Sequence, residues 1–149
     1  MCPLMDVSSV TLQMLWENGL QLIVFYHHHP LVEQHFQLWP GSLLPAPFHN
    51  MTAVPELLVA VAKGIEDRCT KYSDVFHVTQ GILTPDNGCI MSNLTGSLKS
   101  SLCSKLANPF VDWVRRQRSG VSGVNIVTMD FIEMSEFVPC VVRLNFNLS

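Results

Sequence analysis

Apolar residues follow two different periods along the chain, and these periods predict where strands and helices lie. Residues 20–26 are a nearly unbroken apolar run, which is typical of a strand covered on both faces. Residues 75–83 and 123–131 predict two further strands, the second of them buried. Residues 52–71 instead repeat apolar side chains at helical spacing, with Cys69 at the end of the apolar face, so we expect a long helix there.

Residues suited to helix ends predict a short helix near the start of the chain. Ser8 and Ser9 are good N-caps for a helix over residues 10–18. Gly19 can end that helix, because glycine readily adopts the left-handed conformation found just beyond a helix C-terminus.

Similar signals predict three more helices in the second half of the chain. Asn93 or Thr95 can start a helix that runs to Lys105. Asn108 and the proline after it are typical of the N-cap and first position of a separate helix over residues 110–118. Ser135 can cap a last helix that extends to Leu144.

Residues 27–51 contain four prolines and are predicted to be irregular. A connection this long is more often a functional loop than a plain linker. Its aromatic residues Phe36 and Trp39 have two interpretations, insertion into a membrane surface or packing beneath the loop, and we expect packing.

The predicted order is one helix followed three times by a strand and a helix. Such alternation favours an α/β fold with parallel strands and right-handed crossovers. Three parallel strands cannot close a barrel, and an open sheet of three would expose unpaired backbone at both edges. We therefore interpret residues 1–149 as the end, or C-terminal portion, of a longer domain.

Composition narrows the possible partners and location. A net charge of −3 provides no basic excess that would attract nucleic acid. Apolar residues make up 48% and charged residues only 14%, which suggests a hydrophobic partner or a larger core. Five cysteines without a C-x-x-C pair are typical of free thiols in a reducing compartment. With no signal peptide and no membrane-spanning run, we expect a cytoplasmic protein, possibly peripheral at membranes.

Four residues are candidates for chemistry. Asp130 follows the last predicted strand, and its plain alternatives are capping the next turn or pairing with a basic residue. Gln80 lies near the end of the preceding strand, where it could meet substrate hydroxyls. His27 follows the first strand and could line a pocket mouth; the triplet it begins suggests a metal site, but further ligands are lacking, so we expect none. His77 is better explained as a core histidine with satisfied hydrogen bonds.

Five short motifs occur along the chain in a fixed order. They are Thr11-Leu12-x-x-Leu15-Trp16-Glu17, Leu38-Trp39-Pro40-Gly41, Pro45-Ala46-Pro47-Phe48-x-Asn50-x-Thr52, Val78-Thr79-Gln80-x-x-Leu83-Thr84-Pro85 and Val124-Asn125-Ile126-Val127-Thr128-x-Asp130-Phe131. In this order they resemble the C-terminal half of phosphatidylinositol-specific phospholipase C X-domain-containing proteins. The resemblance extends from about Thr11 to Asn145.

The resemblance implies a partial TIM-type barrel, namely its last three βα units preceded by a short helix. It also implies phosphodiester cleavage of an inositol phospholipid or a similar head group. Catalysis in that family relies on a general-base histidine, a general-acid histidine and an arginine, all from the N-terminal half of the barrel. By this resemblance the chain alone is inactive, and the missing N-terminal half-barrel is an expected partner.

The same resemblance implies roles for individual residues. Asp130 corresponds to a family carboxylate that orients the general-base histidine, and such an orienting group fixes the tautomer and raises basicity. Phe48 lies in the loop where the family has an aromatic residue that stacks on the inositol ring, commonly tryptophan or tyrosine, and His49 stands where a small residue is usual. With Phe48, we expect His27 and Gln80 to contact substrate.

The expected substrate is a phosphoinositide or a similar phosphodiester at a membrane surface, and we expect no cofactor. Family members differ in metal dependence, and no acidic cluster in this half supports calcium. An alternative function is a non-catalytic regulatory half-barrel that binds another chain through its open edges.

Overall fold

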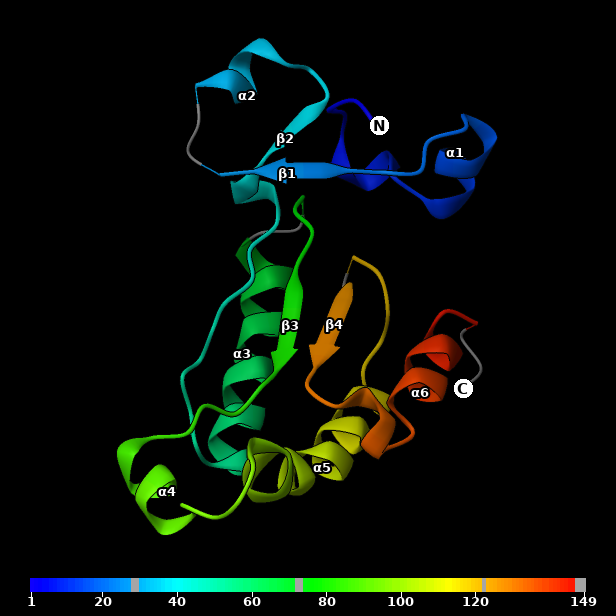
Figure 1. Cartoon of the computed structure of the whole chain (residues 1–149). Coiled ribbons are helices and arrows are strands. Elements are labelled where there is room, and N and C mark those ends of the chain that lie inside the picture. Colours follow the sequence, from blue (N-terminus) through cyan, green and yellow to red (C-terminus); the bar gives the residue numbers. More distant parts are fainter. Residues whose placement is uncertain (28–29, 72–73, 122, 147–149) are drawn as a thin grey trace.

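The computed structural model describes residues 1–27, 30–71, 74–121 and 123–146, and it contains two short parallel sheets (Figure 1). Strands β1 (Val24–Tyr26) and β2 (Leu38–Pro40) form one sheet. Strands β3 (Val78–Gly81) and β4 (Ile126–Met129) form the other. The predicted parallel direction is thus confirmed for β3 and β4. Strand β1 pairs instead with β2, which lies in a stretch predicted to be irregular. The partial TIM-type barrel stays a prediction.

A stretch of extended chain, residues 43–47, runs beside the outer edge of β3. The amide of Phe76 donates to the carbonyl of Leu43 at 2.9 Å, and the amide of Val78 donates to the carbonyl of Pro45 at 3.0 Å. The two prolines of this stretch have no N–H to donate in return, so the pairing is one-sided. The expectation of an open edge on both sides of the sheet is therefore wrong for the β3 side.

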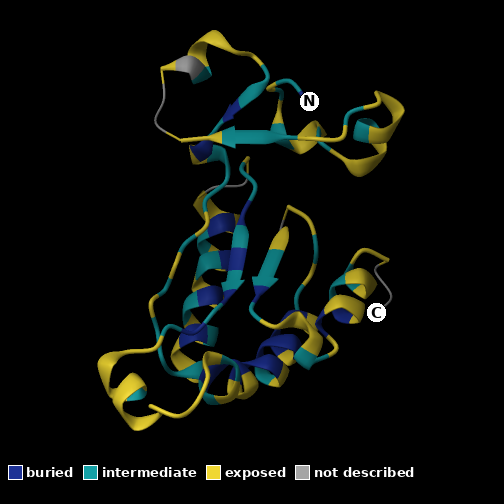
Figure 2. Ribbon diagram, in the orientation of Figure 1, coloured by how far each residue is buried: buried dark blue, intermediate teal, exposed yellow. Residues whose placement is uncertain are grey.

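Three helical segments cover one face of the β3–β4 sheet and form the main core. They are α3 (Val54–Lys71), α5 (Ser104–Arg115), which continues from a π-helical turn (Lys99–Cys103), and α6 (Phe137–Leu144). Figure 2 shows that buried and exposed positions alternate along these helices, as expected for helices with one face in a core. The core comprises Leu57, Val61, Ile65, Leu83, Leu102, Leu106, Ala107, Phe110, Val111, Trp113, Val114, Val124, Met129, Phe137 and Cys140.

Short helices occupy the connections. Their bounds are Val7–Ser9, Leu12–Glu17 (α1), Leu31–Gln34 (α2), Gly41–Leu43, Asn87–Ser92 (α4) and Ile132–Met134. Helix α2, the turn Gly41–Leu43 and strand β2 lie within residues 27–51, which the sequence predicted to be irregular. Polar caps explain α4, because the carboxylate of Asp86 accepts a hydrogen bond from the amide of Cys89 at 2.7 Å.

The first predicted helix is present but begins later than expected. Thr11 caps α1, with its hydroxyl oxygen accepting a hydrogen bond from the amide of Met14 at 3.0 Å. Ser8 and Ser9 belong to the preceding 3-10 turn, so the prediction that they cap α1 is wrong. Gly19 follows the helix with a φ of 64°, which confirms its predicted role at the C-terminus.

The helix predicted to start at Asn108 is not separate from the one before it. Helix α5 passes through Asn108 and Pro109 and ends at Arg115. Leu106 lies on the same buried face as Phe110, so packing of that face continues the helix despite the proline. Tertiary contacts here outweigh a local signal for a helix start.

The predicted strands are shorter and less covered than expected. Ile126 of β4 is 38% exposed, and β1 has no fully buried residue. The helices cover only one face of the β3–β4 sheet, which explains the exposure of Ile126. Ser135 does not cap α6 either: Glu136 is the N-cap, with no side-chain bond, and the buried hydroxyl of Ser135 has no partner among the described residues.

No helix within the described ranges combines the length and apolar character needed to cross a bilayer. All five cysteines are free thiols.

Candidate functional site

The uncovered face of the β3–β4 sheet carries polar side chains near the carboxyl ends of the strands. Gln80 and Thr128 are partners in the parallel register and therefore lie on the same face. Thr79, which points to the opposite face, is buried against the helices. The open face thus presents an amide and a hydroxyl side by side, next to Asp130 at the end of β4.

Asp130 is half-buried and follows β4 directly. The next residue, Phe131, has a φ of 52°, and this left-handed conformation turns the chain sharply away from the strand. The nearby cation of Lys99 is engaged elsewhere, since its ammonium lies 2.6 Å from the carboxylate of Glu133. Within the described chain, the carboxylate of Asp130 has neither a hydrogen bond nor an ion pair, so its predicted alternatives of capping and pairing are not seen there.

The charge of Asp130 nevertheless affects the pKa of a thiol, that of Cys103. The pKa of Cys103 is raised above its ordinary value, first by burial and then by the negative charge of Asp130. Cys103 is therefore a protonated core thiol at neutral pH. Cys103 is buried at the N-cap of α5.

Gln80 organises the loop that carries Phe48. Its side-chain nitrogen donates to the carbonyl of Ala46 at 2.9 Å and to the carbonyl of Pro47 at 3.1 Å. These bonds satisfy two backbone carbonyls of the proline-rich stretch, and they position Phe48 one residue further on. The Phe48 ring is 57% exposed, which leaves its face available for stacking.

His27 lies in a different place from the other predicted site residues. It follows β1 and lines a cavity of about 660 Å³, whose other walls include Tyr26, Glu33 and Ser42. Gly41 packs so closely on the imidazole that a Cβ there would collide with the ring. Asp130 and Gln80 do not line this cavity. The structure therefore brings Gln80 and Phe48 together, and it leaves His27 in a separate cavity.

Sequence reasoning missed the most buried cation of the described chain, Arg68 of α3. Its side chain is 4% exposed, and its guanidinium donates to the carbonyls of Gly120, Val121 and Gly123 in the loop before β4. A signal was present, because Arg68 follows Ile65 at helical spacing on the apolar face. The sequence interpretation assigned that position to Cys69, which is exposed, and this prediction is wrong.

His77 is a core histidine, as predicted. It is 6% exposed, and its Nδ1 lies 3.3 Å from the hydroxyl of Thr79. The pKa of His77 is lowered, first by burial and then by the positive charges of Arg68 and His49. The imidazole is thus neutral at physiological pH.

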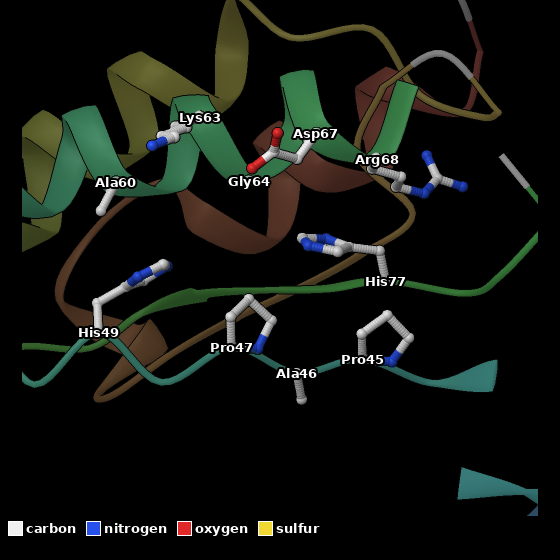
Figure 3. A pocket seen from close by; sticks show the side chains of 10 residues that line it. All are labelled: Pro45, Ala46, Pro47, His49, Ala60, Lys63, Gly64, Asp67, Arg68 and His77. Atoms are coloured by element: carbon white, nitrogen blue, oxygen red, sulfur yellow. The ribbon is translucent and has the colours of Figure 1, made fainter. Parts of the chain in front are cut away.

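Arg68 and His77 both line a second cavity, of about 580 Å³, between α3 and residues 45–49 (Figure 3). Figure 3 shows the ring of His77 pointing from the β3 side toward Gly64 of the helix. Lys63 and His49 lie at the other end of the cavity. No sequence motif indicated this arrangement, which depends on the loop and the helix meeting in space.

The predicted histidine triplet cannot be followed as a unit, since His28 and His29 lie outside the described residues. Across residues 1–27, 30–71, 74–121 and 123–146, no three histidine, cysteine, aspartate or glutamate side chains come together as a metal site would require.

Proteins of known family resemble this chain over nearly its whole length. PI-PLC X domain-containing protein 3 from Danio rerio is 38% identical over 148 residues, which is 99% of this chain and 45% of the relative. PI-PLC X domain-containing protein 2 from Mus musculus is 39% identical over 145 residues, 97% of this chain and 42% of the relative. The chain belongs to the PI-PLC X domain-containing protein family.

The chain spans less than half the length of the curated relatives it matches. The human PI-PLC X domain-containing protein 3 agrees, with 36% identity over 98% of this chain and 44% of its own length. No family model matches the chain, and no solved structure matches it either. The family resemblance predicted from the five sequence motifs is confirmed.

Proposed function

We propose that this chain is the C-terminal portion of a phospholipase C-like phosphoric diester hydrolase of lipid metabolism. The observation that supports it is the placement of Asp130, a carboxylate without a partner in the described chain, at the end of a parallel strand in a PI-PLC X family member. Parallel α/β enzymes carry their chemistry at the carboxyl ends of strands.

In this proposal Asp130 is a positioning residue. Its carboxylate accepts a hydrogen bond from the N–H of a general-base histidine, which fixes the imidazole tautomer and stabilises the imidazolium that forms. That histidine, the general acid and the charge-stabilising arginine come from the N-terminal half-barrel. The chain alone is accordingly inactive, and the N-terminal half is its partner.

Substrate contact in this proposal comes from the loop and strand ends. The exposed ring of Phe48 stacks on the head group of a phosphoinositide or a similar phosphodiester, while Gln80 holds the loop and can offer its side-chain oxygen. His27 contributes from the neighbouring cavity only if substrate extends toward β1. We place the reaction at the cytoplasmic surface of a membrane, with no cofactor.

A chimaera tests the proposal. Residues 1–149 replace the matching segment of the zebrafish relative, and hydrolysis of phosphatidylinositol in mixed micelles is measured. We expect activity in the chimaera and a fall in kcat of about 10²-fold in Asp130→Asn, with a smaller change in KM, because the loss acts on proton transfer. The matched control is Glu136→Gln, which removes a nearby exposed carboxylate and should leave kcat unchanged. An unchanged rate in Asp130→Asn would refute its assigned role.

A second function is favoured by one observation, the outer edge of β4. No described strand pairs with that edge, and Ile126 exposes apolar surface beside it. Such an edge suits a non-catalytic regulatory chain that pairs with another strand. Sedimentation and thermal melting of the purified chain distinguish the two functions. A folded dimer with cooperative melting supports the regulatory function, whereas aggregation indicates a severed barrel.

A further inference from the structure

The cavity between α3 and residues 45–49 has the size of a small-molecule site. Its volume of about 580 Å³ falls within the roughly 300–1,000 Å³ that such sites occupy. Backbone hydrogen bonds to residues 43–47 and the two bonds from Gln80 fix its floor. One wall is therefore preformed, which lowers the entropic cost of binding.

Small residues of α3 keep the opposite wall open. Gly64 lies in the middle of the helix, where glycine costs about 1 kcal/mol relative to alanine. A Cβ at Gly64 would meet only the ring of His77, at 3.8 Å, which is ordinary contact. Packing thus does not require glycine here, and a larger side chain would occupy the cavity itself.

The charges around the cavity favour an anion. Two cations, Lys63 and Arg68, line it, and the imidazoles of His49 and of the neutral His77 add polar groups. The one acidic lining residue, Asp67, is already compensated, since its carboxylate lies 2.6 Å from the ammonium of Lys71. The lining therefore carries an excess of positive charge.

Arg68 adds an observation that points to a missing partner. No carboxylate of the described chain lies within ion-pair distance of its guanidinium, which is bound to neutral carbonyls only. Its buried Nε has no hydrogen-bond partner in the same part of the chain. A buried charge and a buried N–H left in this state cost free energy that a bound anion would offset.

From these contacts we infer that the cavity binds a phosphate-bearing small ligand. The phosphate lies among the basic side chains, where arginine and lysine offer charge-assisted hydrogen bonds. The organic part of the ligand packs on Pro45, Pro47 and Ala60, which supply apolar walls. Both a soluble phosphate ester and a lipid phosphate head group have this chemistry.

Calorimetric titration of the full chain with glycerol 3-phosphate and with inorganic phosphate tests the inference. We expect saturable binding of the ester, about fivefold or more weaker in Lys63→Gln, because a charge-assisted contact is lost. Asp67→Asn should tighten binding, since it removes a negative charge from the lining. Lys105→Gln, an exposed lysine of α5 that does not line the cavity, is the matched control and should bind like the parent.

Two further measurements complete the test. Gly64→Leu should lose binding by filling the cavity, whereas Gly64→Ala should retain it; circular dichroism checks that each variant is folded. Enrichment of the protein on phosphatidylcholine vesicles that contain phosphatidic acid would identify the ligand as a lipid phosphate head group. Binding of the ester without such enrichment would identify it as a soluble phosphate ester. The inference would be overturned if neither soluble phosphate nor the vesicles showed saturable binding. It would also be overturned if Lys63→Gln and Lys105→Gln weakened binding of the ester equally.

Discussion

The two sheets of this protein are stabilised in different ways. The β3–β4 sheet lies on a core of fifteen buried residues contributed mainly by α3, α5 and α6. The β1–β2 sheet has no such helical layer, and α1 contributes no buried residue to it. Its stability rests on a small aromatic cluster around Trp39.

That cluster shows how a small sheet can be held without a helical layer. The indole of Trp39 is fully buried, and its N–H donates to the carbonyl of Cys2 at 3.0 Å. Phe25 and Phe76 pack edge-on against the indole, with ring centroids 5.8 and 5.9 Å away. Because Phe76 lies two residues before β3, the cluster also links the two sheets. The β1–β2 unit nevertheless lacks a helical layer, so we expect the β3–β4 unit to determine global stability and the β1–β2 unit to open before it.

The largest effect should come from Phe110→Ala in the main core. The ring of Phe110 is fully buried, stacks near Trp113 and Phe137, and lies against Gly81, where a Cβ would collide with it. Removing a buried phenyl ring costs about 3–5 kcal/mol. Chemical denaturation should show this loss in the global transition. A loss confined to the β1–β2 amides would contradict the comparison.

Trp39→Phe should have a smaller and more local effect. The substitution keeps an aromatic ring but leaves the carbonyl of Cys2 without its donor, which costs about 1–3 kcal/mol. Hydrogen exchange should accelerate at β1 and β2 and remain nearly unchanged at β3 and β4. Equal acceleration in both sheets would show that the two units unfold together.

The weakest effect should be a pH dependence carried by the β3–β4 unit. The folded state lowers the pKa of His77, so below the ordinary histidine pKa of about 6.5 the unfolded chain binds the proton more readily than the folded one. Stability should be complete at neutral pH and fall as the pH drops through that value. His77→Asn should flatten this part of the pH profile of the denaturation midpoint, whereas His35→Asn, at an exposed position, should not.

Local sequence signals predicted an element correctly where all of the signals lay within that element. The helical spacing of residues 52–71 gave α3 nearly in full, and Gly19 ends α1 as predicted. The same local reasoning failed at Pro109, which lies within a helix whose buried face continues past it. It also missed β2, because a strand of three residues ending in proline is recognisable only by its partner β1.

Some features of the candidate site could be predicted from the sequence, and others could not. The placement of Asp130 after a strand, and the family to which the chain belongs, could be inferred from residues in order along the sequence. The roles of Gln80 in holding the Phe48 loop and of Arg68 in the 580 Å³ cavity could not. Those roles depend on contacts between segments more than thirty residues apart.

The sequence alone therefore determined which segments form the main helices and strands, the parallel direction of the strands, and the family. Periodicity and capping depend on residues that are close together in the sequence, so they can be recognised without the structure. Only the tertiary structure decided which faces are covered, which cation is buried and where the cavities lie, because burial is a property of segments that meet in space. Arg68 combines the two: its spacing was visible in the sequence, and its environment was not.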